Sequence, residues 1–248
     1  MSLRFIFLVL IALTFCAGSA HAEEYTKPSW EDLTRTLIRF SALKLTDQSL
    51  VDEYSIVTEC DLYQAFYHDD FKWKRVRDAV LQSVRNNVAT YPLNYRYDGT
   101  VQIDRYDFDK KIFLFTKKST IHNINAFALY SVVGTGCGTA DVKTLPRSFR
   151  AVLQRPVTID GLPLSETDGK ALLKQMDDGG NTSRIIHARF NIRITRIEPL
   201  IKIVDNTGTH FGQAGVPGIG SVTMDARLDS IDFYSDEERT QLIYHYQP

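Results

Sequence analysis

Hydrophobic positions change their spacing three times along this chain. From Ser29 to about residue 90, apolar side chains recur every three or four residues, which predicts amphipathic helices. From about residue 91, apolar and polar side chains alternate, which predicts strands with one buried face. A short helical pattern over residues 165–180 interrupts the strands. This order predicts an α+β fold, in which N-terminal helices pack on a mainly antiparallel sheet with one inserted helix.

Polar caps mark the starts of these helices. Ser29 and Thr46 precede the first two, and Ser165 precedes the inserted one. Asp69 begins the most regular helix, where its charge suits the helix dipole. One face of that helix carries Trp73, Val76, Val80, Val84 and Val88.

Two alternating runs are the clearest strands. In residues 186–195 the apolar positions are Ile186, Ala188, Phe190, Ile192 and Ile194, and the residues between them are polar. A second run covers residues 222–229, and a final strand includes Tyr244 and Tyr246. We therefore expect one wet face and one buried face on this sheet.

The first 22 residues have the pattern of a secretory signal peptide. Arg4 supplies a positive charge, an apolar run follows over residues 5–16, and Ala20 and Ala22 form an Ala-x-Ala cleavage site. Export to the periplasm of a Gram-negative bacterium, or secretion, is therefore expected. Lipid attachment at Cys16 is the alternative, but Phe15 precedes it where a small residue is required.

Cleavage would leave residues 23–248, which we predict to be a single α+β domain. Its helical part spans about 29–90 and its β-rich part about 91–248. No later segment is apolar enough to cross a membrane, so no transmembrane segment remains after cleavage. The whole chain has 29 basic and 30 acidic residues. Because nucleic-acid binding depends on neutralising phosphates, this balance argues against a nucleic-acid partner.

Two cysteines remain after cleavage. Cys60 and Cys137 most simply form one disulfide in an oxidising compartment. The alternative is a nucleophilic thiol at Cys137, in the glycine-rich segment 134–138, but no base can be assigned to it.

One strand face carries the candidate ligand-binding residues, His187, Arg189 and Arg193. Arginines bind phosphate or carboxylate groups through paired hydrogen bonds, so an anionic ligand or an envelope component is the expected partner. The alternative is a ladder of ion pairs with Asp225 and Asp229, if the two alternating strands are neighbours.

Other local motifs are better explained as structure. Residues 204–209 are similar to an aspartic-protease loop, but Asn206 separates Asp205 from Thr207, and turn chemistry explains the segment. The glycine-rich segment 212–220 lacks the Gly-Lys-Ser/Thr ending of a phosphate loop. Helix capping explains the carboxylates of residues 68–70 better than metal binding does. No cofactor and no metal site are therefore expected.

Three segments carry a resemblance to a known group of proteins. They are the signal peptide, the helix start His68-Asp-Asp-Phe-Lys-Trp73, and the charged turn and strand Arg105-Tyr-Asp-Phe-Asp-Lys-Lys-Ile-Phe-Leu-Phe115. Together they resemble exported bacterial proteins grouped as domains of unknown function. The resemblance implies neither an activity nor site residues.

These observations favour an exported, non-enzymatic binding or envelope-accessory protein. The motivation is that the helix and strand signals are coherent, whereas no catalytic motif accompanies them. The alternative is a hydrolase of envelope polymers, whose acid and base residues only the fold brings together. The partner and the oligomeric state are left open by the sequence.

The disulfide and the cleavage site are tested together by intact-mass spectrometry of the exported protein. We expect a mature chain beginning at Glu23, with a mass about 2 Da below that of the fully reduced form. Two free thiols, at Cys60 and Cys137, would contradict the disulfide.

Overall fold

The computed structural model describes residues 24–46, 48–132, 141–197 and 220–248. The helices in these ranges are α2 (Trp30–Arg39), α3 (Gln48–Thr58), α4 (Cys60–Phe66), α5 (Asp70–Asn87), η1 (Val88–Thr90) and α6 (Glu166–Asp178). The strands are β1 (Asn94–Asp107), β2 (Ile112–Phe115), β3 (Ile121–Ser131), β4 (Ser148–Ile159), β5 (Gly161–Pro163), β6 (Ile185–Ile197), β7 (Ser221–Tyr234) and β8 (Leu242–Tyr246).

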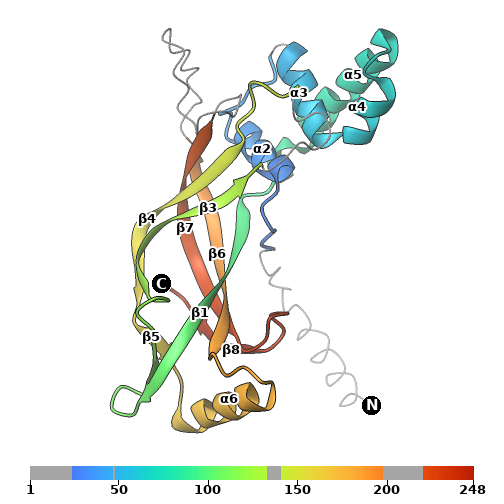
Figure 1. Cartoon of the computed structure of the whole chain (residues 1–248). Helices are drawn as coiled ribbons and strands as arrows, with labels where there is room; N and C mark the ends of the chain where they lie inside the picture. The colour runs from blue at the N-terminus through green and yellow to red at the C-terminus, as the bar shows by residue number, and fades with distance from the viewer. Residues whose placement is uncertain (1–23, 47, 133–140, 198–219) are drawn as a thin grey trace, which may run out of the picture.

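The eight strands form one long, curled sheet. Their order is β3-β4-β7-β6-β1-β2-β5, and β8 pairs with β7. The β4–β7 pair is parallel, whereas the other strand pairs in the described residues are antiparallel. Helices α3, α4 and α5 gather at one end of the sheet, and α6 lies at the other (Figure 1). The predicted α+β fold, with N-terminal helices, a mainly antiparallel sheet and one inserted helix, is confirmed.

Three of the four predicted caps, Ser29, Asp69 and Ser165, form hydrogen bonds, whereas the cap by Thr46 stays a prediction. Ser29 accepts from the Asp32 amide at 3.0 Å, and the Asp69 carboxylate accepts from the Lys72 amide at 3.0 Å. Ser165 accepts from the Asp168 amide at 3.1 Å and starts α6. Each contact satisfies one of the amides that the first turn of a helix leaves without an intrahelical acceptor.

Helix α4 is an element that the sequence pattern does not predict. It is only seven residues long and none of its side chains is fully buried, so its pattern is too short to identify a helix. Cys60 is its first residue, whereas the expected partner Cys137 lies outside the described residues. The disulfide therefore stays a prediction. The loop around Asp205 also lies outside the described residues, as does nearly all of the second glycine-rich segment.

Strand β4 is also missing from the sequence prediction, because Pro156 interrupts its pattern. The pairing of β4 with β7 ends at Leu153, and its register with β3 shifts between Val152 and Val157. Pro156 therefore stands where the ladder requires no amide donor, which is where strands tolerate proline. Before it, Phe149 and Ala151 are fully buried, as alternation requires.

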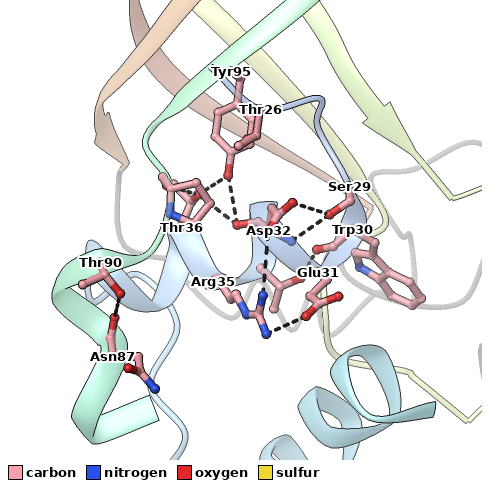
Figure 2. A network of polar contacts seen from close by, with 12 residues as sticks. Thr26, Ser29, Trp30, Glu31, Asp32, Arg35, Thr36, Asn87, Thr90 and Tyr95 are labelled. Carbon is pink, nitrogen blue, oxygen red and sulfur yellow. Dashed lines mark hydrogen bonds and ion pairs between the residues drawn. The ribbon is translucent and has the colours of Figure 1, made fainter. Parts of the chain in front are cut away.

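Helix α2 is fixed to the start of β1 by polar contacts in the core. The Tyr95 hydroxyl donates to the Asp32 carbonyl at 3.0 Å and lies 2.5 Å from the Thr36 hydroxyl (Figure 2). Thr36 also donates to the Pro92 carbonyl at 2.8 Å. Tyr95 and Thr36 are both fully buried. Their hydroxyls are thus satisfied inside the core, which fixes the angle at which the chain enters β1.

A second contact attaches α3 to the chain before β4. The buried Glu53 carboxylate accepts from the backbone amides of Lys143, Thr144 and Leu145 at 2.8–3.1 Å. The Thr144 hydroxyl adds a contact of 2.6 Å. These donors offset the cost of burying the charge. Buried apolar residues of the helices and the sheet form one hydrophobic cluster. The single-domain prediction for residues 23–248 stays a prediction.

We expect Glu53→Gln to destabilise the fold by about 3 kcal/mol. The glutamine side chain replaces one accepting oxygen with an NH2 group, whose two N–H donors would face backbone N–H donors. Urea unfolding followed by circular dichroism measures the change. The control is Glu166→Gln, which removes an exposed pair with Lys170 on α6 and should leave the unfolding midpoint almost unchanged. Equal shifts in the two variants would show that Glu53 does not hold the layers together.

Candidate functional site: a pocket on the polar face of the sheet

The polar face of β1, β6, β7 and β8 contains the strand residues expected to bind a ligand. Arg189 on β6 lies between Asp98 on β1 and Asp232 on β7 in the register of the sheet. Its Nε donates to Asp98 at 3.1 Å, and its guanidinium lies 5.4 Å from the centre of the Tyr234 ring. Arg239 approaches the same carboxylate at 3.4 Å. The Asp98 carboxylate therefore organises two arginines at one end of the face.

A bulge in β7 organises the other end. Ser230 pairs with Asn191 and Leu228 pairs with Ile192, so Asp229 is an extra residue on β7. Leu228 and Ile231 are both buried although they are three residues apart. Strict alternation would place them on opposite faces. The bulge resolves this conflict, because both Asp229 and Ser230 then lie on the polar face between the two buried residues.

Asp229 is the centre of a cluster of donors. Its carboxylate accepts from the Tyr25 hydroxyl at 2.8 Å, Arg193 Nε at 3.0 Å and Arg227 Nε at 2.7 Å. The side chain is 14% exposed, whereas that of Arg227 is 58% exposed. Burial raises the pKa of Asp229, but the hydrogen bonds from Tyr25, Arg227 and Arg193 outweigh it and hold the pKa below its usual value. Burial and the bond to Asp229 raise the pKa of Tyr25.

A second carboxylate holds a histidine beside this cluster. Asp232 lies 2.5 Å from Nδ1 of His245 and accepts from the Asn191 amide at 2.8 Å. Asn191 also donates to the Ser230 hydroxyl at 2.8 Å. Because Nδ1 faces the carboxylate, Nε2 is the ring nitrogen that remains for a ligand. The His245 side chain is half exposed.

These groups surround a cavity of about 490 Å³, within the size range of small-molecule sites. Its lining residues are Tyr25, Arg193, Arg227, Leu228, Asp229, Ser230, His245, Gln247 and Pro248. We call it the Asp229 pocket. The carboxylate lies beneath its donors, so the accessible charge is that of the Arg227 guanidinium, beside the half-exposed His245 ring. The pocket therefore presents hydrogen-bond donors to a ligand.

Of the three predicted ligand-binding residues, Arg193 lines this pocket. Arg189 lies further along β6 against Asp98, and His187 pairs in register with Thr100 and Tyr234. The structure thus separates residues that the sequence placed in one group. It also shows ion pairs between β6 and β7, from Arg193 to Asp229 at 3.0 Å and from Arg196 to Asp225 at 2.6 Å. The ion-pair interpretation therefore describes part of this face.

Sequence reasoning missed Tyr25 and His245. Each comes from a segment distant in sequence from β6, and no local motif links them. Tyr25 reaches the sheet because Thr26 bridges to Tyr95 beside the start of β1. The position of Asp229 did leave a signal, since the apolar alternation changes phase between Leu228 and Ile231.

Neither a metal-ligand cluster nor a membrane-spanning helix is found within the described residues. In residues 24–46, 48–132, 141–197 and 220–248, no three His, Cys, Asp or Glu side chains gather as metal ligands would. Within the same ranges, none of the helices has the length and apolar character that crossing a bilayer requires.

The fold and the pocket define an α+β protein with a polar cavity on its sheet. Residues 47–174 match a family model described as "Domain of unknown function (DUF4852)", which spans more than half of the 248 residues. The chain belongs to this family, which confirms the resemblance to a domain of unknown function. Bacterial origin and export stay predictions. No curated protein matches the chain, and no solved structure matches it.

We expect Asp229→Asn to lower the stability at neutral pH by about 1 kcal/mol, because the substitution removes a charged acceptor from two guanidinium groups. A carboxylate with a lowered pKa stabilises the fold above its unfolded pKa, and this stability is lost as the pH falls through its folded pKa. The difference between wild type and variant should therefore shrink below about pH 4.

Urea unfolding at several pH values measures this difference. Asp225→Asn is the matched control, since Asp225 pairs with the more exposed Arg196 and its loss should change stability less. A difference that stays constant down to low pH would show that the charge of Asp229 is not what stabilises the cluster.

Proposed function

We propose that this protein is an exported, non-enzymatic binding or envelope-accessory protein that holds an anionic ligand in the Asp229 pocket. The site of action is the periplasm or the medium. The observation that best supports anion binding is the arrangement of charged groups in the pocket. A single covered carboxylate holds the two guanidinium groups in place, and the more exposed of these, Arg227, faces the cavity.

The chemistry of the donors supports an anion with more than one oxygen. A guanidinium group forms paired hydrogen bonds with carboxylate or phosphate oxygens. Arg227 is already oriented by Asp229, so binding would cost little side-chain entropy. His245 lines the same cavity, and its Nε2 atom is a polar group that such a ligand can contact.

Export rests on the signal-peptide pattern of residues 1–22, which lie outside the described residues. The Cys60–Cys137 disulfide belongs to the same proposal, because a structural disulfide requires an oxidising compartment. The Asp229 pocket lies outside residues 47–174, which match the family model. Anion binding is therefore proposed for this chain and not for the family.

The hydrolase alternative has one observation in its favour. Asp232 and His245 form a carboxylate–imidazole pair that lies at the same pocket, and such a pair is suited to act as a general base. However, the Ser230 hydroxyl is buried and engaged by Asn191, so it is poorly placed as a nucleophile. This favours binding over hydrolysis.

Isothermal titration calorimetry of the mature chain with inorganic phosphate and with glucuronate tests the proposal. We expect Arg227→Gln to weaken binding about tenfold, the effect of losing one charge-assisted hydrogen bond. Arg155→Gln is the control, because Arg155 is an exposed arginine on β4, away from the pocket.

Equal affinities in the two variants, or no binding of either anion by the wild type, would contradict the proposal. If purified cell-wall glycan were cleaved by the wild type and not by His245→Gln, the hydrolase would replace the binding protein. Intact recovery of the glycan would leave binding as the function.

A further inference from the structure

A second cavity, of about 300 Å³, lies among the helices at the other end of the molecule. It is enclosed by α2, α3, α5 and η1, and we call it the helical cavity. Figure 2 shows Arg35 on α2 and, on the neighbouring segment, Asn87 and Thr90. The lining residues are Arg35, Tyr54, Thr58, Glu59, Val80, Ser83, Val84, Asn87, Thr90, Tyr91 and Pro92.

The charges around this cavity disfavour an anion. Arg35 pairs with Glu31 at 2.5 Å and with Asp32 at 3.7 Å, so two carboxylates share its guanidinium. Glu59 adds a third carboxylate to the wall. Burial raises the pKa of Glu31, and the charges of Asp32 and Glu59 raise it further against the effect of Arg35. The cavity therefore differs in kind from the Asp229 pocket.

Neutral polar groups form the rim. Ser83, Asn87 and Thr90 are exposed residues at the end of α5 and in η1. The Asn87 amide donates to the carbonyl of Ser83 at 2.9 Å, which orients it along the helix. Hydroxyl and amide groups both donate and accept hydrogen bonds. Such a rim matches a ligand whose own groups do both, as the hydroxyls of a sugar do.

Aromatic and aliphatic side chains lie beneath this polar rim. Tyr54 is 2% exposed and Tyr91 is 8% exposed, and Val80 lies buried beside them. Aromatic rings with a polar edge offer an apolar surface and a hydroxyl at once. A pyranose ring has the same combination of C–H faces and equatorial hydroxyls. These side chains and the rim are thus complementary to the two kinds of surface that one sugar ring exposes.

One buried donor also lacks an acceptor. Arg35 Nε is buried and has no hydrogen-bond partner among the described residues. An unsatisfied buried donor is costly, and such a group in a cavity wall calls for an explanation. The atom has almost no accessible surface, so a small shift of Arg35 would be needed for a ligand hydroxyl to accept from it.

We propose that the helical cavity binds one ring of a neutral saccharide. The cavity is at the lower end of the size range of ligand sites, which suits a single ring better than a longer segment. All lining residues except Arg35 fall within residues 47–174. Saccharide binding is therefore a property of the part of the chain that matches the family model, and it does not depend on the Asp229 pocket.

The test is a titration of the ¹⁵N-labelled mature chain with N-acetylglucosamine and with methyl β-glucoside, followed by amide chemical shifts. We expect shifts confined to residues that line the helical cavity. Asn87→Ala should weaken binding at least about fivefold, a typical loss for one hydrogen bond. The matched control is Asn86→Ala, because Asn86 is the adjacent exposed asparagine of α5 and bonds to Gln82 instead.

A second pair of variants does not depend on a single hydrogen bond. Ser83→Trp fills the rim and should abolish binding, whereas Gln82→Trp adds the same bulk to a neighbouring exposed position and should not. Both positions are exposed, so neither substitution should disturb the fold. The dispersion of the amide spectrum checks that each variant is folded. Arg227→Gln should leave saccharide binding unchanged, which separates this site from the Asp229 pocket.

Three results would overturn the proposal. They are the absence of shifts at the cavity with both sugars, equal affinities for Asn87→Ala and Asn86→Ala, and shifts at the cavity with inorganic phosphate but with neither sugar.

Discussion

The buried carboxylate of Glu53 is the contact on which the arrangement of helices and sheet depends. It lies at the centre of α3 and accepts from three consecutive backbone amides before β4. A buried charge is tolerated only where such donors surround it, so α3 and this segment have one favourable relative position. The Tyr95–Thr36 contact does the same for α2 and β1. The helical cavity is lined in part by α2 and α3, the two helices that these contacts hold in place.

The sheet shows how one extra residue produces a pocket. Without the bulge at Asp229, strict alternation along β7 would place either Leu228 or Ile231 on the polar face. Burial of both side chains forces the bulge, and the bulge directs Asp229 and Ser230 to the same side. Arg193, Arg227 and Tyr25 then converge on Asp229. The binding groups of this face are thus a consequence of how the apolar face is packed.

The elements that the sequence predicted share a strong local signal. Ser29, Asp69 and Ser165 cap helices as expected, because a cap is a contact between residues three positions apart. Strand β6 follows from its alternation alone. By contrast, α4 has no buried side chain, and β4 contains Pro156 at a position that only its neighbours make acceptable. Both elements depend on pairing and packing that no short stretch of sequence reveals.

The sequence by itself determined the α+β class, the caps of three helices and the clearest alternating strands, and its first 22 residues are the basis on which we expect export. It also identified Arg193, because a charged residue on an alternating strand must lie on the wet face. Only the tertiary structure decided that Arg193 belongs with Tyr25, Asp229 and His245, while Arg189 belongs with Asp98. The physical reason is that local patterns specify which face a side chain takes, whereas strand order, register and bulges specify its neighbours.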